Sequence, residues 1–515
     1  MTITLHSQFP IDRNGLIYTD LLACAARMKN KDHTLWGAEA EPEAAHRMNW
    51  LNLPFSSREL LPQLDALSAW ARSAGLTNIL LAGMGGSSLA AEVIAKTYLK
   101  ALTVLDTTDP DQITRAIPTD FTHTIIVVGS KSGATIETAS QMALFTELIK
   151  SAGQNPVDHI VIVTDFNSPL DMRARKDGFR VINADPDVGG RYSALSAFGL
   201  VPAALMGVDV SILLDDALAA SEKFTEPDSV VVALATAIFD AGEQNLALCD
   251  EGSLLPGLSD WIEQLVAESS GKNQQGRLPI VIESSTSKVA GNGLKIGFAE
   301  ATSADLVINA TLGEQFILWE WVTALLCRAL GVDPFNQPNV SEAKERTRAI
   351  LDSWAKGNEI HLTPACENEN LQIFTTLPSS SLREALQKFF QIEAHYIAIM
   401  AYLNRGEDDL VMNTRTLVAS ITGIGTTFGW GPRFLHSTGQ FHKGGAQNGA
   451  FIQITGENDL DLSIPGQDFS FHTLLMAQAL GDGEALSERD RPLIRIHLKN
   501  RKRGIAELIA VLNEL

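Results

Sequence analysis

Two short segments join glycines to hydroxyl side chains directly after an apolar run. They are GMGGSS (Gly83–Ser88) and SKSGAT (Ser130–Thr135), and a helical pattern follows each. Glycines let a backbone turn tightly around an anion, and the N-terminus of the following helix offers unpaired amides. GMGGSS alone is equally consistent with an ordinary turn with N-capping serines. Two such loops at adjacent strand ends of one sheet favour phosphate binding, with donors from Ser87, Ser88, Ser130, Lys131, Ser132 and Thr135.

The spacing of these glycines argues against a nucleotide site. GMGGSS has neither the G-x-G-x-x-G spacing of a dinucleotide fold nor the Lys-Ser/Thr pair of a P-loop. A dinucleotide site also needs an acidic residue at the end of the next strand, and only Asp106 stands there. A dinucleotide-dependent oxidoreductase is therefore the weaker hypothesis.

An arginine and a glutamate stand at the ends of two other segments. In DVGGRYSALSAFGL (Asp187–Leu200), two glycines place Arg191 at a turn, where its permanent charge can stabilise an anionic oxygen. In WIEQLVAESSGK (Trp261–Lys272), Glu268 stands where a probable helix ends, a good place to present a carboxylate to a cleft. Each residue alone has an ordinary alternative, an ion-paired arginine or a solvated glutamate at a helix end.

A lysine and two histidines lie further along the chain. PFNQP predicts a rigid turn, and Lys344 stands about one turn into the helix after it. FLHSTGQFHKGG (Phe434–Gly445) carries His436 and His442 in a polar loop bounded by glycines. One histidine is more often structural, but two in such a loop favour acid–base chemistry.

Alternating apolar runs and helical patterns predict the elements that hold these residues. Five short runs between residues 78 and 184 indicate a parallel, doubly wound sheet. The pattern restarts with runs at Asn245–Asp250, Leu278–Ser284, Ala304–Ala310 and Tyr396–Leu403. We therefore expect an α/β protein with two doubly wound parallel-sheet domains. The expected divisions are a helical N-terminal segment (1–54), two α/β domains (55–220 and 221–405) and a C-terminal α/β segment (406–515).

Composition and charge exclude several classes of partner. The chain has 515 residues, with 61 acidic against 40 basic side chains and a formal net charge of −21. Such a surface repels nucleic acid and anionic membranes. The four cysteines are scattered without metal or disulfide spacing. The first residues lack a basic region and an apolar run, so we expect a cytoplasmic protein.

Five of these segments, in order along the chain, resemble motifs of the phosphoglucose isomerase family. GMGGSS resembles the family's G-I-G-G-S loop, and SKSGAT resembles its S-K-[ST]-x-x-T loop. DVGGRYSALSAFG fits G-G-R-[FY]-S, AESSGK resembles [GM]-E-S-x-G-K, and PFNQPNVSEAK resembles F-D-Q-x-G-V-E-x-x-K. The resemblance covers most of the chain and implies that both α/β domains are of the sugar isomerase type.

The resemblance implies reversible isomerisation of glucose 6-phosphate and fructose 6-phosphate through a cis-enediol, in glycolysis and gluconeogenesis, without metal or cofactor. It implies that Glu268 moves the proton between C1 and C2 and that Arg191 steadies the enediolate. Lys344 is implicated in ring opening and substrate contact. The partner is a small sugar phosphate, and the family's homodimer is implied as well. The implied phosphate and sugar contacts are Gly86, Ser87, Ser130, Lys131, Ser132 and Thr135.

Two departures from the family pattern concern the second half of the chain. PFNQPNVSEAK has Asn336 and Asn339 where the family has Asp and Gly, and its acid is displaced to Glu342. The family's ring-opening histidine normally precedes this segment, but LHSTGQ, with His436, follows it by about a hundred residues. That order resembles the isomerase half of bifunctional proteins that also carry a transaldolase. No transaldolase half lies in this sequence, so we expect none of that activity. His436 matches the ring-opening histidine, and His442 is its local rival.

Two other functions stay open at this point. A catalytically silent regulator could keep both loops and bind sugar phosphates, although the joint presence of Glu268, Arg191 and Lys344 argues against it. An isomerase of another hexose phosphate, such as mannose 6-phosphate, is the second alternative. Assays on the different substrates separate these possibilities.

Overall fold

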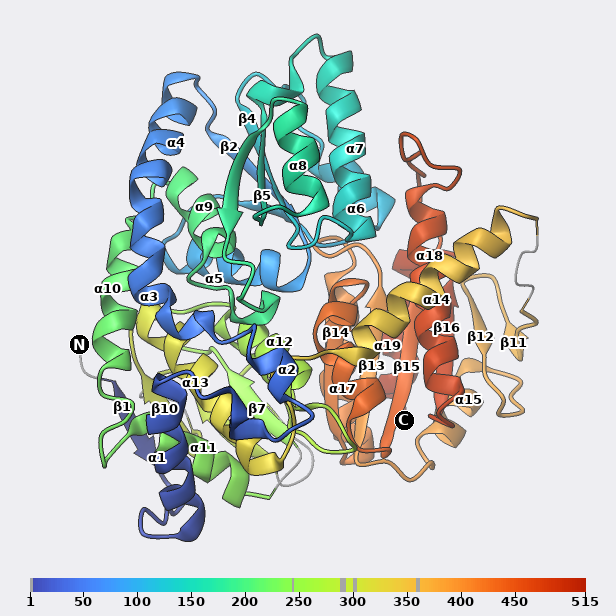
Figure 1. Ribbon diagram of the computed structural model, residues 1–515. Helices are drawn as coiled ribbons and strands as arrows, with labels where there is room; N and C mark the ends of the chain where they lie inside the picture. The colour runs from blue at the N-terminus through green and yellow to red at the C-terminus, as the bar shows by residue number, and fades with distance from the viewer. Residues whose placement is uncertain (1–2, 243–244, 288–292, 300–302, 358–361) are drawn as a thin grey trace.

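Three sheets organise the protein in the computed structural model, which describes residues 3–242, 245–287, 293–299, 303–357 and 362–515 (Figure 1). Each sheet has a core of parallel strands, and helices connect the strands. The α/β class, the parallel sheets and the additional C-terminal segment are as the sequence predicts.

The first sheet has the strand order β3-β2-β4-β5-β6, and all of its strand pairs are parallel. Its strands are β2 (Asn78–Gly83), β3 (Thr103–Leu105), β4 (Thr124–Gly129), β5 (Ile160–Asp165) and β6 (Arg180–Ala184). The helices around it are α4 (Leu61–Ser73), α5 (Leu89–Thr97), α6 (Pro110–Ala116), α7 (Ile136–Ser151), α8 (Pro169–Lys176), α9 (Ala197–Leu205) and α10 (Val210–Ser221). The order reverses between β2 and β4, which marks the crevice where such sheets bind ligands.

The second sheet has the strand order β1-β10-β9-β7-β8, and its edge strand β1 comes from the N-terminal segment. Strand β1 (Thr4–Ser7) pairs antiparallel with β10. The helices that follow β1 in the N-terminal segment are α1 (Leu16–Lys29), α2 (Glu41–Ala44) and α3 (Leu53–Ser56). The parallel strands are β7 (Asn245–Cys249), β8 (Leu278–Val281), β9 (Leu294–Gly297) and β10 (Leu306–Asn309). The helices are α11 (Val230–Asp240), α12 (Leu258–Ser270) and α13 (Leu312–Leu330).

The third sheet has the order β11-β12-β16-β15-β13-β14 and forms the C-terminal domain. Its strands are β11 (Cys366–Glu367), β12 (Leu371–Phe374), β13 (Tyr396–Tyr402), β14 (Gly425–Trp430), β15 (Gly449–Gly456) and β16 (Leu493–Leu498). Its helices are α14 (Pro338–Trp354), α15 (Leu382–Phe389), α16 (Asn413–Thr422), α17 (Thr438–Gly444), α18 (Phe471–Ser487) and α19 (Arg501–Asn513).

The assignment of the run Tyr396–Leu403 to the second α/β domain is wrong. The strand in this run, β13, pairs with β14 and β15 in the third sheet. An apolar run shows that a buried strand exists, but its partners are decided by long-range packing. The third sheet therefore starts well before the boundary expected at residue 405.

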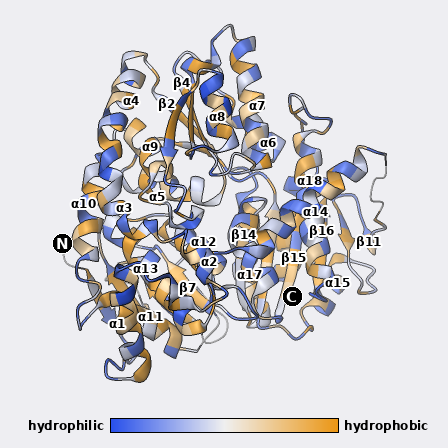
Figure 2. Cartoon of the chain, viewed as in Figure 1, coloured by the Kyte–Doolittle hydropathy of each residue, from blue (hydrophilic) through white to orange (hydrophobic). Residues whose placement is uncertain are grey.

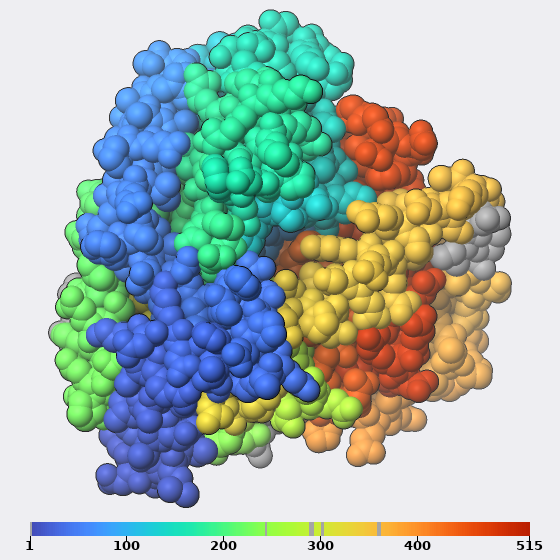
Figure 3. Space-filling model, in the orientation of Figure 1, coloured from blue at the N-terminus to red at the C-terminus, as the bar shows by residue number. Residues whose placement is uncertain are grey.

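Apolar packing joins the domains around a shared centre. One continuous core contains residues from both the first and second sheets, and another joins strands of the first sheet to α14 and α18 of the C-terminal domain. Figure 2 shows hydrophobic residues, in orange, on the strands near β2 and β4 and along parts of the helices. Figure 3 shows the yellow residues of α14 between the first domain and the red part of the C-terminal domain. Within the described residues, no helix is both long and apolar enough to cross a membrane.

Candidate active site

The two glycine and hydroxyl loops lie next to each other at the point where the first sheet reverses its strand order. Strands β2 and β4 are hydrogen-bonded neighbours, and their last residues, Gly83 and Gly129, are paired in register. GMGGSS begins at Gly83, and SKSGAT follows Gly129 and leads into α7. The predicted placement of both loops at adjacent strand ends is confirmed.

The first loop packs so closely on the turn of Arg191 that it needs glycine. A Cβ atom on Gly86 would lie 2.0 Å from the carbonyl oxygen of Gly190 and 3.0 Å from the amide nitrogen of Arg191. The hydroxyl of Ser193 donates a hydrogen bond of 3.2 Å to the carbonyl oxygen of Gly86. GMGGSS and the Arg191 turn therefore form one unit.

The guanidinium of Arg191 joins this unit to two other segments. The side chain is 3% exposed. Nε donates to Oγ of Ser269 at 2.8 Å, and Nη1 lies 3.1 Å from Oε1 of Glu268. Its remaining hydrogen bonds go to the PFNQP turn, at the carbonyl oxygens of Pro334 (2.6 Å) and Asn336 (3.0 Å) and at Oε1 of Gln337 (2.9 Å). Arg191 therefore fixes the end of α12 against the start of α14.

Glu268 lies in the last turn of α12, with its carboxylate held at both oxygens. One oxygen faces Arg191, and the other accepts a hydrogen bond of 3.1 Å from Nε2 of Gln264. The same Nε2 donates to the backbone oxygen of His436 at 2.8 Å. One amide group thus connects the carboxylate of Glu268 to the loop of His436.

His436 meets a second carboxylate, that of Glu137, on the side of the second loop. Nε2 of His436 lies 3.0 Å from Oε1 of Glu137, the second residue of α7. Nε2 of Gln478 donates to the same oxygen at 2.7 Å, and Oε1 of Gln478 accepts from Thr108 at 2.7 Å. Burial opposes the ionisation of Glu137, but the charge and hydrogen bond of His436 outweigh it and hold the pKa of Glu137 below its ordinary value, with a smaller effect from Lys344.

Glu137 and Gln478 are site residues that the sequence analysis missed. The available signal for Glu137 was its place in the first turn of the helix after SKSGAT, where the helix dipole favours a negative charge. No local signal indicates Gln478, because its partner comes from another domain.

A small cavity of about 50 Å³ brings several of these parts together. Its lining includes Ala134 of SKSGAT, Glu137, His436 and Gln478, together with Lys344 of α14. Lys344 is exposed at this place. The predicted lysine and histidine therefore share one cavity next to the second loop.

His442 lies elsewhere, inside an aromatic cluster of the C-terminal domain. Its ring lies 5.3 Å from the ring of Phe451 and stacks on Tyr396 at 6.2 Å. Neither ring nitrogen has a hydrogen-bond partner among the described residues. Burial, together with the nearby Lys443 and Arg491 cations, lowers the pKa of His442 well below its usual value. Its neutral ring packs as a core side chain, so the geometry favours His436 for acid–base chemistry.

The hydroxyls of the second loop form hydrogen bonds within the loop itself. Oγ of Ser130 accepts from the amide of Gly133 at 3.1 Å and lies 3.3 Å from Oγ1 of Thr135. Oγ of Ser132 accepts from the amide of Ala134 at 3.2 Å. A turn held in this way presents hydroxyls and amides at the start of α7, which suits an anion.

Lys131 is already occupied by other groups. Its Nζ lies 2.5 Å from Oδ2 of Asp165 and donates to the carbonyl oxygen of Pro186 at 2.9 Å. A phosphate contact would require the ammonium to be shared with Asp165. The predicted phosphate role of Lys131 therefore has less geometric support than those of Ser132 and Thr135.

A buried cation, Lys272, stands behind the Arg191–Glu268 pair. Its Nζ donates to the carbonyl oxygen of Asp333. Burial, followed by repulsion from Arg191, lowers the pKa of Lys272 to about 7. The Glu268 carboxylate thus lies close to two basic side chains, Arg191 and Lys272.

Comparison with known proteins agrees with this architecture. Residues 59–293 match the Phosphoglucose isomerase family. The matched stretch contains both loops, Arg191 and Glu268, whereas Lys344 and His436 lie beyond it. The matched stretch therefore covers the first sheet and the strands β7 and β8 of the second sheet.

Two curated relatives match somewhat less than half of the chain. A protein named "Probable glucose-6-phosphate isomerase" from Haloarcula marismortui is 31% identical over 237 residues, which is 44% of this chain and 54% of the relative. The "Glucose-6-phosphate isomerase" of Thermus thermophilus is 30% identical over 247 residues, covering 46% and 58%. The chain thus spans about half the length of the curated relatives it matches.

A solved structure extends the likeness of fold. The crystal structure of a glucose-6-phosphate isomerase from Chlamydia trachomatis matches with a TM-score of 0.56 and 19% identity, covering 69% of this chain and 89% of that one. At this identity the likeness concerns the fold. The roles of the individual residues, the homodimer and the resemblance to bifunctional proteins stay predictions.

Proposed function

We propose that this protein catalyses the reversible isomerisation of glucose 6-phosphate and fructose 6-phosphate. The observation that carries the proposal is the buried Arg191–Glu268 pair, 3.1 Å apart, held against the GMGGSS loop. A carboxylate beside a fixed guanidinium supplies the base and the anion-stabilising group that an enediolate needs. Roles in glycolysis and gluconeogenesis and a cytoplasmic location are part of the same proposal.

Phosphate binding is assigned to the second loop. The hydroxyls of Ser132 and Thr135 and the first amides of α7 hold the phosphate, because a helix N-terminus and its free amides attract anions. Gly86 and Ser87 of the first loop contact the sugar. This local grip is needed because the chain carries a net charge of −21 that repels the substrate as a whole.

Ring opening is assigned to His436, supported by its 3.0 Å contact with Glu137. The imidazole transfers a proton between O1 and O5 of glucose 6-phosphate, which breaks the C1–O5 bond and leaves an open-chain aldehyde. Glu137 orients the ring and balances its positive charge. Lys344, which lines the same cavity, supplies a cation near the substrate oxygens.

Proton transfer between carbons is assigned to Glu268. Its carboxylate removes the proton from C2 of the open-chain aldose, and the electron pair forms the C1–C2 double bond of the enediolate. Arg191 stabilises the negative O1 until the proton on O2 has passed to O1. Glu268 then returns its proton to C1, and an electron pair on O2 forms the C2=O2 bond of the ketose. A base positioned in this way contributes about 10²–10⁴ in rate.

A coupled assay tests the proposal. Purified protein is given fructose 6-phosphate, and glucose 6-phosphate is detected through its dehydrogenase; parallel reactions contain mannose 6-phosphate. We expect turnover between the glucose and fructose esters and at least about tenfold lower activity on the mannose ester. Tight binding of fructose 6-phosphate without turnover would instead identify a silent regulator, and faster conversion of mannose 6-phosphate would change the substrate.

A further inference from the structure

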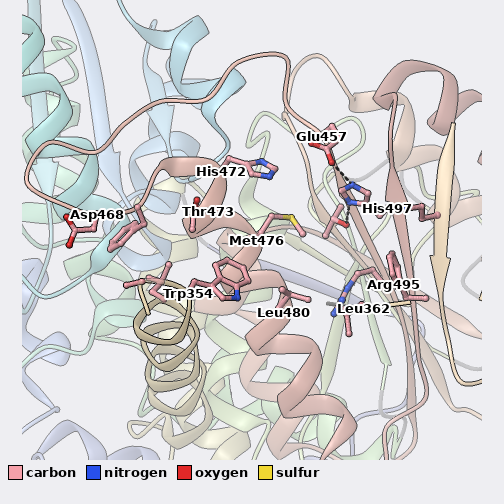
Figure 4. A pocket seen from close by; sticks show the side chains of 16 residues that line it. Trp354, Leu362, Glu457, Asp468, His472, Thr473, Met476, Leu480, Arg495 and His497 are labelled. Carbon is pink, nitrogen blue, oxygen red and sulfur yellow. Dashed lines mark hydrogen bonds and ion pairs between the residues drawn. The ribbon is translucent and has the colours of Figure 1, made fainter. Parts of the chain in front are cut away.

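A second and much larger pocket lies in the C-terminal domain. Its volume is about 660 Å³, and it opens between the helices α14 and α18 and the strands β12, β15 and β16 (Figure 4). Among the described residues, its lining includes none of Glu268, Arg191, Lys344 and His436. Pockets of about 300–1,000 Å³ hold small organic ligands.

One part of the pocket wall is aromatic and apolar, and polar side chains make up the rest. Trp354 at the end of α14, Phe374 of β12 and Met476 of α18 contribute large side chains, each only partly buried. Figure 4 shows Trp354, Met476 and Leu480 grouped on the side of the pocket near Arg495. Flat aromatic rings and a polarisable thioether favour a ligand with a planar, apolar body.

Arg495 gives this pocket a buried positive charge. The residue is 8% exposed, and its Nε donates to Oε1 of Gln453 at 2.5 Å. Within the described part of the chain, it forms no ion pair. Two acids lie nearby, Glu484 and Asp482; neither is within ion-pair distance of Arg495, and Asp482 is paired with Lys443 at 2.5 Å. A buried charge is costly unless an opposite charge meets it, so the guanidinium favours an anion in the pocket.

Arg495 remains a cation under ordinary conditions. Burial lowers the pKa of Arg495 to about 10, which still leaves it protonated at neutral pH. Figure 4 shows its guanidinium on the pocket side of β16.

The remaining charges limit the ligand to a single negative group. Asp468 and Glu457 also line the pocket, and Glu457 is engaged by Nε2 of His497 at 3.1 Å. These carboxylates would repel a second negative charge. One guanidinium matches one carboxylate in charge and in its two-pronged geometry.

We propose that this pocket binds a small carboxylate with a planar, apolar body, with the carboxylate on Arg495 and the body against Trp354 and Met476. The site is separate from the sugar-phosphate site and independent of the isomerase proposal. It gives the C-terminal domain a ligand of its own.

Matched probes test the charge requirement on the full-length protein. Titration calorimetry compares 2-naphthoate, its neutral amide 2-naphthamide, and 2-naphthyl phosphate. We expect naphthoate to bind at least about tenfold more tightly than the amide and the phosphate ester. Equal binding of acid and amide, or no binding of naphthoate, would overturn the proposal. Tighter binding of the phosphate ester would overturn the choice of a carboxylate.

Two variants test the place of binding. Arg495→Met keeps the apolar stem of the side chain and removes the charge, so the preference for acid over amide should fall to within about twofold. Met476→Trp fills the pocket from a partly exposed helix position and should abolish binding of both probes, even if Arg495→Met fails to fold. A preference that persists in the first variant, or an unchanged Kd in the second, would place the probe elsewhere. Saturating fructose 6-phosphate should leave naphthoate binding unchanged, and displacement would contradict a separate site.

Discussion

Glu137 and His436 stand 299 positions apart in the sequence, yet Oε1 of the first lies 3.0 Å from Nε2 of the second. The carboxylate comes from α7, the helix after the SKSGAT loop of the first domain, and the imidazole comes from the C-terminal domain. The pair therefore exists only when the two domains are packed together. Nε2 of Gln478 in α18 donates a hydrogen bond to the same Oε1 of Glu137. The proposed ring-opening group is thus assembled by domain packing.

Replacing His436 should impair the reaction mainly at the closed ring. For His436→Ala we expect kcat with fructose 6-phosphate to fall by about 10²-fold or more, because ring opening loses its proton carrier. With 5-deoxyfructose 6-phosphate, which cannot form the furanose ring, the loss should be far smaller. Steady-state kinetics on both substrates measure the difference.

His442→Phe is the matched control for this experiment. His442 packs among aromatic rings and its ring nitrogens have no partners among the described residues, so the variant should keep activity within about twofold. If His436→Ala loses the same activity on both substrates, or if His442→Phe loses more activity than His436→Ala, His436 is not the ring-opening residue.

Replacing Glu268 should remove turnover but keep the ligand. Glu268→Gln retains the shape of the side chain and its contact with Gln264 but loses the base, so kcat should fall by at least about 10²–10⁴-fold. Calorimetry should still detect fructose 6-phosphate with a Kd within about fivefold of the wild type. Near-normal turnover in this variant would show that another group moves the proton.

The second loop should determine substrate affinity. The double variant Ser132→Ala with Thr135→Ala should raise KM for fructose 6-phosphate by about tenfold or more, because two donors to the phosphate are lost. Thr146→Ala serves as the control, since this hydroxyl lies on the same helix and donates to the carbonyl oxygen of Met142. If KM of the double variant equals that of the control, the phosphate binds elsewhere.

Glu263 provides a test through the pH dependence of stability. Burial, followed by repulsion from Asp260, raises the pKa of Glu263 to about 8. In the unfolded chain it ionises near its ordinary value of about 4.3. The folded state therefore binds the extra proton between these values, and the contribution of Glu263 to stability is lost as the pH rises from about 4.5 to about 8.

Glu263→Gln imitates the protonated side chain at every pH. Its stability advantage over the wild type should be small near pH 5 and should grow to at least about 1 kcal/mol near pH 8. Denaturation by urea at several pH values measures the difference. An advantage that stays constant with pH would contradict the buried, neutral state of Glu263.

Local features of the site could be predicted from the sequence because each depends on a strand, a turn and a helix in succession. GMGGSS and SKSGAT follow β2 and β4, and a parallel sheet brings such turns to one edge. Glu268 could be placed at the end of α12 from the Ser-Ser-Gly that follows it.

Features that depend on distant partners could not be predicted in the same way. The choice between His436 and His442 is decided by Tyr396 and Phe451, which bury the second ring from two other strands. The same limit explains why the sequence assigns β13 to the wrong sheet. Its apolar residues predict a buried strand, but they do not predict its pairing with β14 and β15. From the sequence, Glu137 is an ordinary acidic residue in the first turn of a helix. Only the folded structure shows its contact with His436.

Hydrogen transfer at the sugar carbons is the most direct test of the account. Glucose 6-phosphate is incubated with the protein in D2O, and NMR follows the appearance of deuterium at C2 of glucose 6-phosphate and at C1 of fructose 6-phosphate. We predict incorporation with the wild type and with Glu263→Gln, and none above background with Glu268→Gln. Incorporation by Glu268→Gln at the wild-type rate would contradict the central claim that the carboxylate beside Arg191 moves this proton.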